Sequence, residues 1–418
     1  MQSKIVKTFK KYDNKFGDEF DISKNELFLL IRKRKQARSN NFSFKEFFVH
    51  FILIILSFLS ILISKFKKIK TANYFNVLRN SGGKIDFRSK YIVDNFNLSK
   101  SLNIVRSVSF IDSLKAYLKY PNVIFYLAFD YFNFLLMKKT KHKNLTEEYL
   151  VLHELAKKNL STFKKIFTYL EIKKFISIDD ERIMQTFLKV CFDLKITSIG
   201  YMHYRFHDFE VAINYKCFDI FFVWSNFFKK KLLKVNKQYK NKKIVFSGIP
   251  KKKLCKSSNS KVNVIYILDN DLNFTHITNI LDHLVDNKCK LFIKFKPQNF
   301  IEKKWVDYCT QNNIPYFKNE TLEEVNAKYN FDYFVATVST ALLEATLYNA
   351  IPIIILSKIR EAQDLIKDKV AYSVKNGEEL LKIASKKPSQ AIINKFYKKV
   401  WGLNNYNKKN IKNILYAK

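Results

Sequence analysis

The stretch "FDYFVATVSTALLEATLYNAIPIIIL" (residues 331–356) decides the fold. Two strongly apolar runs enclose a Ser-Thr pair and a short amphipathic segment, which predicts a strand, a helix and a second strand. The same alternation of short apolar runs with helical stretches recurs through much of the chain. This pattern is typical of an α/β protein whose parallel sheets are covered by helices on both faces.

The chain is long enough for two domains. It has 418 residues, whereas a single core stops growing at roughly 250–300 residues. The alternation runs through residues 71–250 and restarts in residues 262–385, and the polar stretch "KKKLCKSSNSK" (residues 251–261) between them predicts a linker. We therefore expect two doubly wound, Rossmann-like domains, with residues 386–418 forming helices that pack back on the N-terminal domain.

Residues 1–70 form a basic extension that contains a hydrophobic segment. Residues 47–64, "FFVHFILIILSFLSILIS", carry no formal charge, and their length is at the lower edge of the roughly 17–25 residues that span a bilayer. Basic residues flank this segment on both sides, so the charge bias gives no orientation. A buried core helix would show the same composition. An all-apolar helix with lysines at both ends is more typical of a membrane-bound or interfacial helix.

The charge balance is strongly basic. There are 75 Lys+Arg against 37 Asp+Glu, a net charge of +38, while only 7 Gly and 6 Pro are present. The excess is mostly lysine and is dispersed along the chain, which favours compositional bias and attraction to an anionic membrane face. A nucleic-acid-binding protein would instead gather Lys and Arg on one stripe with interleaved aromatics.

Cysteine usage indicates a reducing compartment. The five cysteines are odd in number, far apart and never in a C-x-x-C pair, which argues against a disulfide framework and a zinc site. Residues 1–40 are charged and mixed, so no secretory signal is expected. We expect a cytoplasmic protein.

Ligands of open parallel sheets bind beyond the carboxyl ends of the strands, so the residues after strands are the candidates for a site. Ser339 and Thr340 start the helix after the first strand of the opening stretch. Their hydroxyls have the right chemistry to cap that helix. The same helix start could hold a phosphate, with Glu344 one turn further in to receive a sugar hydroxyl or complement the dipole.

Two other strand ends carry charged or amide side chains. In "IKFKPQ" (residues 293–298), Lys296 and Gln298 follow a strand, where an ordinary turn at the proline would also explain them. In "SIDDERI", Asp179, Asp180 and Glu181 stand where a strand gives way to a helix. Such carboxylates can complement the helix dipole, or one of them can take a proton from an acceptor hydroxyl.

The densest polar cluster is "IGYMHYRFHD" (residues 199–208), directly after an apolar strand. It brings together Tyr201, His203, Arg205 and His207 in a chain that has only 7 His. We expect a functional site here, with Gly200 allowing a tight exit from the strand. No third ligand accompanies the two histidines, so a metal site is not expected.

These stretches resemble those of GT-B glycosyltransferases, and more closely of bacterial capsule and lipopolysaccharide-type transferases. "GYMHYRF" is similar to a "G-Y-Q-H" stretch, with Met202 where Gln is usual, and "FKPQN" to "K-P-H-P", with Gln298 in place of His. "STALLEA" resembles "S-S/T…E", and "CFDIFFVWS" (residues 217–225) resembles an "a-D-x-x-x-v-w" strand. The likeness covers about residues 90–360.

The resemblance implies a metal-independent transfer without a cofactor. The phosphates of a nucleotide sugar would lie near Lys296, Gln298 and the Ser339–Thr340 helix start. Asp180 or a neighbouring carboxylate, with His203, would deprotonate the acceptor, and Tyr201, Arg205 and His207 would line the acceptor side. The acceptor would be a saccharide or a lipid-linked saccharide at the inner face of the plasma membrane. An epimerase-like enzyme for nucleotide sugars, or a non-catalytic polysaccharide-assembly protein, is the alternative.

Overall fold

The computed structural model describes two compact units. Unit 1 comprises residues 1–223, 229–247 and 407–418, and unit 2 comprises residues 224–228 and 248–406. The structure describes residues 8–9, 11–12, 14, 22–24, 27, 30, 43–77, 96–107, 109–137, 145–178, 184–202, 217–249, 261–268, 274–285, 289–295, 303–318, 320–356, 360–402 and 411–412.

The described part of unit 1 holds a seven-stranded, all-parallel sheet in the order β3-β2-β1-β4-β5-β6-β7. Most residues of the strands before β7 are buried, as expected for a parallel sheet covered on both faces, whereas the edge strand β7 has no buried residue. The strands are β1 (Thr71–Asn76), β2 (Leu102–Arg106), β3 (Val123–Phe125), β4 (Lys174–Ile178), β5 (Thr197–Tyr201), β6 (Ile220–Val223) and β7 (Lys243–Phe246).

Aromatic side chains fill one face of this sheet. Phe187 of α8 lies against Phe163 and Phe167 of α7 and against Tyr74 and Phe175 of the sheet. The helices and 3-10 turns around the sheet are α3 (Phe44–Phe66), η3 (Leu98–Lys100), α5 (Phe110–Lys119), α6 (Tyr126–Leu135), α7 (Leu145–Leu170), α8 (Met184–Asp193), α10 (Asn226–Val235) and η4 (Lys237–Asn241).

In unit 2, the residues that the structure describes form a six-stranded parallel sheet in the order β10-β9-β8-β11-β12-β13. Its strands are β8 (Val262–Ile267), β9 (Cys289–Lys294), β10 (Tyr316–Phe317), β11 (Tyr333–Ala336), β12 (Ile351–Ile355) and β13 (Tyr372–Val374). Its helices are α11 (Phe274–Val285), α12 (Lys303–Gln311), α13 (Leu322–Tyr329), α14 (Ala341–Glu344), η5 (Ala345–Tyr348), α15 (Arg360–Asp368), α16 (Gly377–Ala384) and α17 (Gln390–Trp401).

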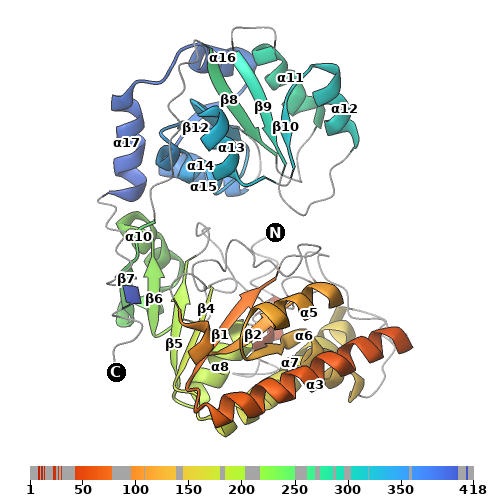
Figure 1. Cartoon of the computed structure of the whole chain (residues 1–418). Coiled ribbons are helices and arrows are strands. Elements are labelled where there is room, and N and C mark those ends of the chain that lie inside the picture. The colour runs from red at the N-terminus through yellow and green to blue at the C-terminus, as the bar shows by residue number, and fades with distance from the viewer. Residues whose placement is uncertain are drawn as a thin grey trace. The chain divides into compact units, whose positions relative to one another are not determined.

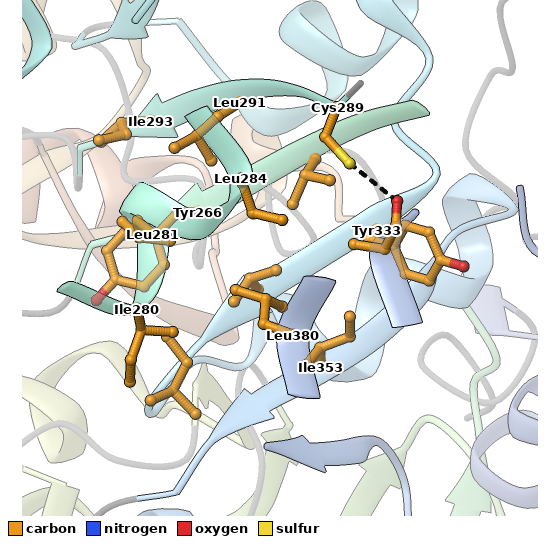
Figure 2. Close-up of a cluster of buried hydrophobic side chains, with 14 of the residues drawn as sticks. Tyr266, Ile280, Leu281, Leu284, Cys289, Leu291, Ile293, Tyr333, Ile353 and Leu380 are labelled. Atoms are coloured by element: carbon orange, nitrogen blue, oxygen red, sulfur yellow. Dashed lines mark hydrogen bonds between the residues drawn. The ribbon is translucent and has the colours of Figure 1, made fainter. Parts of the chain in front are cut away.

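Alternate strand residues of unit 2 face opposite sides. Tyr266, Leu291 and Ile353 pack with Leu281 of α11 and Leu380 of α16 in one core (Figure 2). The other side is aromatic: the chain of ring contacts runs from Phe317 through Phe292 and Phe331 to Phe334 and Tyr348. The prediction of two doubly wound parallel sheets is therefore confirmed.

The expected packing of residues 386–418 on the N-terminal domain stays a prediction, and the described helix α17 groups with unit 2. Its end contacts the rings of Trp224 and Phe228, which belong to the expected N-terminal domain by sequence and to unit 2 by contacts. Phe396 of α17 belongs to the core of unit 2 and contacts the Tyr372 ring. Trp401 is buried, and its indole Nε1 donates to Thr346 Oγ1 at 3.1 Å. The helix packs here because unit 2 offers an apolar surface at η5 and β12. Residues 407–418 group with unit 1.

Candidate functional site

Both sheets contain a topological switch point. Counted within each unit, the strand order is 3-2-1-4-5-6, with a seventh strand added in unit 1. The connections therefore leave in opposite directions from β1 and β4, and from β8 and β11. In open α/β sheets, ligands bind beyond the carboxyl ends of the strands at this point. The strand ends that matter are Ile178 in unit 1 and Ala336 in unit 2.

The residues that follow β11 show how the predicted helix start is built. The Ser339 hydroxyl accepts the Ala341 N–H at 3.3 Å, so it satisfies one amide of the first turn. Thr340 has helical φ and ψ angles of −61° and −27°, and its side chain makes no capping hydrogen bond. The capping role predicted for this pair therefore belongs to Ser339.

The helix itself is shorter than the sequence suggests. α14 covers only Ala341–Glu344 before the chain tightens into η5. The amides of Leu342, Leu343 and Glu344 already donate to the carbonyls of Ser339 and Thr340. A large helix dipole is not available in so short an element. Phosphate binding at Ser339 and Thr340, and sugar binding at Glu344, stay predictions.

Two buried polar groups at the same sheet edge were missed by sequence reasoning. Lys294, the last residue of β9, is only 3% exposed. Its ammonium donates to the carbonyls of Phe295 at 2.5 Å and Lys318 at 3.4 Å. Thr337, which follows β11, is fully buried, and its Oγ1 has no hydrogen-bond partner. Neither is recognisable from sequence because each lies in or beside an apolar run.

Burial changes the acidity of Lys294. Removal from water lowers the pKa of its ammonium to about 8, and the carboxylates of Glu320 and Glu324 oppose that shift only in part. The two carbonyls that it contacts partly replace water. This edge of unit 2 therefore carries a buried amine that is still mostly protonated at neutral pH.

In unit 1, Tyr201 and Met202 close β5. Tyr201 is the last residue of the strand, is buried and pairs in register with Ile178 of β4. Met202 is fully buried and its N–H donates to the Phe222 carbonyl. Tyr201 thus stands beside the strand end that precedes Asp179, and its predicted role toward the acceptor stays a prediction.

The reason for Gly200 differs from our expectation of a tight exit. Gly200 lies within β5, and a Cβ there would be 2.4 Å from Phe218 Cδ2 and 2.5 Å from Phe221 Cδ2. Packing of these two rings against the strand, rather than a turn, therefore excludes any larger residue.

Asp219, the aspartate of "CFDIFFVWS", is held by hydrogen bonds from residues of the neighbouring strand segments. Asp219 precedes β6 and accepts hydrogen bonds from the Ser198 N–H and hydroxyl and from Lys242. Burial raises the pKa of its carboxyl, but the hydrogen bonds from Lys242 and Ser198 outweigh it, so the pKa is lowered. These contacts tie the amino ends of β5, β6 and β7, the edge opposite to the expected ligand edge.

Eight of the predicted site residues lie outside the described residues: Asp179, Asp180, Glu181, His203, Arg205, His207, Lys296 and Gln298. Their order in the chain still fixes which strand each follows. Asp179 comes directly after β4, His203 follows β5 by two residues, and Lys296 follows β9 by two residues. Within the described residues, no group of three His, Cys, Asp or Glu side chains could hold a metal ion.

Comparison with known proteins gives the fold. No protein-family model matches the chain, and no curated protein matches it. The solved structure of the calicheamicin glycosyltransferase CalG4 matches with a TM-score of 0.54 at 8% identity, over 83% of this chain and 98% of that one. The chain has a GT-B fold. The lipopolysaccharide outer core galactosyltransferase WaaB matches with a TM-score of 0.50 at 12% identity, over 83% and 99%.

The GT-B likeness does not select a reaction by itself. A UDP-N-acetylglucosamine 2-epimerase also matches, with a TM-score of 0.49 at 11% identity, over 82% of this chain and 93% of that one. A fold alone does not determine a reaction, so the residues at the switch points must decide it.

Proposed function

We propose that the chain is a metal-independent glycosyltransferase. It would move a sugar from a nucleotide-sugar donor to a saccharide or lipid-linked acceptor in the assembly of a bacterial surface polysaccharide. One observation carries the proposal. Ile178 and Ala336 end the strands at the two switch points, and the two stretches with the chemistry for transfer, Asp179–Glu181 and Ser339–Thr340, follow them within four residues.

The residues of unit 2 suit the donor. The leaving nucleotide is anionic at its phosphate, so it needs hydrogen-bond donors and positive charge rather than a general base. The Thr340 hydroxyl is not used for capping and can donate to a phosphate oxygen. Lys296 and the amide of Gln298 would add charge and a hydrogen bond, and Glu344 would receive a hydroxyl of the sugar or ribose.

The residues of unit 1 suit the acceptor. A carboxylate among Asp179, Asp180 and Glu181, together with His203, would take the proton of the acceptor hydroxyl as its oxygen bonds to the anomeric carbon. The bond from that carbon to the phosphate oxygen breaks, and the nucleotide leaves with the electron pair. Tyr201, Arg205 and His207 would hold the acceptor saccharide.

Nucleotide binding and turnover test the proposal. The full-length protein is mixed with CMP-, UDP-, GDP- and CDP-linked sugars in the presence of EDTA, and thermal shift and release of free nucleotide are measured. We expect one nucleotide class to raise the melting temperature and its sugar to be consumed. Isomerisation of the donor sugar without release of nucleotide would identify the epimerase-like alternative instead. Failure to bind any of the four classes would contradict both.

A further inference from the structure

α3 is amphipathic, but its more polar side is buried and its more apolar side is exposed. The side buried against unit 1 carries serines: Leu53, Ser57, Ser60, Ile61 and Ser64 are buried. The outward side is aromatic and aliphatic, and its exposed large side chains are Phe44, Phe48, Phe51, Ile55, Phe58, Leu59, Leu62, Ile63 and Phe66. Spacings of three and four residues place most of these on one stripe of the helix. We call this stripe the outer face of α3.

The helix is held against unit 1 along its whole length. Near its start, Phe47 contacts the Phe132 ring and His50 stacks on Tyr131, both from α6. In the middle, α3 lies along the edge strand β3. Figure 1 shows it in orange-red, beside α6 and α7.

The end of α3 is fixed by charge. Lys65 and Lys70 both pair with Glu171, which follows α7, and Lys65 also donates to the Tyr169 carbonyl at 2.7 Å. A helix that crosses a bilayer is surrounded by lipid or by other spanning segments on every side. α3 is instead covered on one side by the edge of an α/β sheet, so it is fit for contact with lipid on its outer face only.

The outer face is too large and too apolar for ordinary exposed surface. Twenty-three residues extend about 35 Å, and the two end residues, Phe44 and Phe66, are 74% and 90% exposed. Contiguous apolar patches of more than a few hundred Å² mark sites of contact with protein or membrane. Among the described helices, α3 alone is long and apolar enough for a membrane segment.

Charge at the ends of the outer face identifies the occupant. Lys45 is exposed at its start, and Lys67 and Lys68 are exposed directly after Phe66. The sequence that precedes α3 contains Lys33, Arg34, Lys35 and Arg38. Aromatic and aliphatic side chains along a helix, with lysines at its ends, match acyl chains bordered by anionic headgroups. A second copy of this chain would bring the same lysines against these and be repelled.

We propose that α3 is a docking helix that lies in the plane of an anionic lipid surface, with its outer face buried among the acyl chains and without crossing the bilayer. The inference does not depend on glycosyl transfer, since it rests only on the surface of unit 1. It would bring unit 1, the expected acceptor side, to the membrane where a lipid-linked acceptor resides.

Vesicle binding tests the docking face. Full-length protein is sedimented with vesicles of phosphatidylcholine alone or mixed with phosphatidylglycerol. We expect binding to the mixed vesicles, a loss of at least tenfold in the double variant Ile55→Glu/Leu62→Glu, and a loss of about fivefold for each charge removed in Lys67→Gln/Lys68→Gln. The control is Phe246→Glu, because Phe246 is exposed on β7, at the opposite edge of the same sheet from β3.

Depth measurements distinguish an in-plane helix from a spanning one. Phe48→Trp and Leu62→Trp are each bound to vesicles of brominated lipids with the bromines at known depths. The three native tryptophans lie in unit 2 and supply a constant background. An in-plane helix gives both positions the same depth, whereas a spanning helix separates them by about 21 Å along its axis.

Three results would overturn the proposal. These are vesicle binding that survives Ile55→Glu/Leu62→Glu, an absence of wild-type binding to either vesicle type, and unequal depths at positions 48 and 62. Light scattering provides a further check. Should the wild type be a dimer that Ile55→Glu/Leu62→Glu dissociates, the outer face would be a contact between two copies. Circular dichroism is measured on each variant, so that loss of binding can be distinguished from loss of structure.

Discussion

The Ser57 hydroxyl lies 3.0 Å from the backbone nitrogen of Phe125 and accepts its hydrogen bond. The same hydroxyl donates to the Leu53 carbonyl at 2.7 Å, one turn earlier in α3. Phe125 ends β3, the edge strand of the sheet in unit 1, so this amide has no neighbouring strand to pair with. A buried serine of α3 thus provides the acceptor that the edge strand lacks.

Replacement of Ser57 by alanine should therefore destabilise unit 1. Ser57→Ala leaves the buried Phe125 amide without an acceptor, which costs about 1–3 kcal/mol. Ser64→Ala is the matched control on the same face, because the Ser64 hydroxyl is buried with no hydrogen-bond partner. Its loss should be neutral or stabilising. Urea unfolding of both variants measures the difference, and equal effects would show that Ser57 contributes nothing beyond packing.

Gly200→Ala should also destabilise unit 1, for a steric reason. The added methyl group would overlap the rings of Phe218 and Phe221, and overpacking of this kind costs roughly 1–3 kcal/mol. The double variant Gly200→Ala/Phe218→Leu should lose less than the sum of the two single variants, because the smaller side chain makes room. Additive losses in chemical denaturation would contradict the contact.

These contacts show which parts of the fold were accessible from sequence. The strands and helices of unit 2 from residue 262 to 329 match the expected pattern, because apolar runs and helical stretches alternate there. β1 was not predicted as a strand, although it lies at the switch point, since Asn73 and Asn76 break its apolar run.

The candidate site was predicted only as far as strand order allows. Apolar runs identify strands, and Ser339 follows β11 as expected. That the residues after several strands meet at one edge stays a prediction. Lys294 was missed because its ammonium contacts the carbonyls of Phe295 and of Lys318, and Lys318 is 24 residues further along the chain than Lys294. The sequence pattern predicts which residues follow a strand. It does not predict which polar side chains, such as that of Lys294, are buried.

Lys294 should make stability depend on pH in the alkaline range. Its pKa is lowered from 10.5 to about 8 in the folded chain. Between these values the unfolded chain binds more protons, so stability rises with pH there, by at most about 1.4 kcal/mol per pH unit. The difference in unfolding free energy between wild type and Lys294→Met should thus move in favour of wild type between pH 8 and 10. Lys290→Met, an exposed lysine of the same strand, controls for the lost charge, and an equal pH dependence in both variants would contradict the burial of Lys294.

Glu171 should make the stability of unit 1 depend on pH in the acidic range. Hydrogen bonds from Lys70 and Lys65 lower its pKa from 4.5 to about 2. Its contribution to stability is therefore complete above pH 4.5 and lost as the pH falls toward 2. Glu171→Gln should remove this part of the acid sensitivity, and Glu154→Gln, another exposed carboxylate of unit 1, provides the comparison. Identical acid unfolding of wild type and Glu171→Gln would argue against the two lysine contacts that hold the end of α3.

Variants of the two switch points should affect different kinetic constants. Thr340→Val removes a hydroxyl that no capping hydrogen bond uses, so it should raise KM for the nucleotide sugar by about 10- to 100-fold through loss of a bond to phosphate. Ser339→Ala is a less specific test, because it also removes the acceptor of the Ala341 amide.

Asp180→Asn and His203→Ala should instead lower kcat by about 10²–10⁴-fold with donor binding retained, as expected for loss of proton transfer. Thr310→Ala, an exposed threonine of α12, controls for the loss of a hydroxyl in unit 2. If all these variants changed KM alone, the residues after β4 and β5 would hold substrate without taking its proton, and the base would have to be sought elsewhere in unit 1.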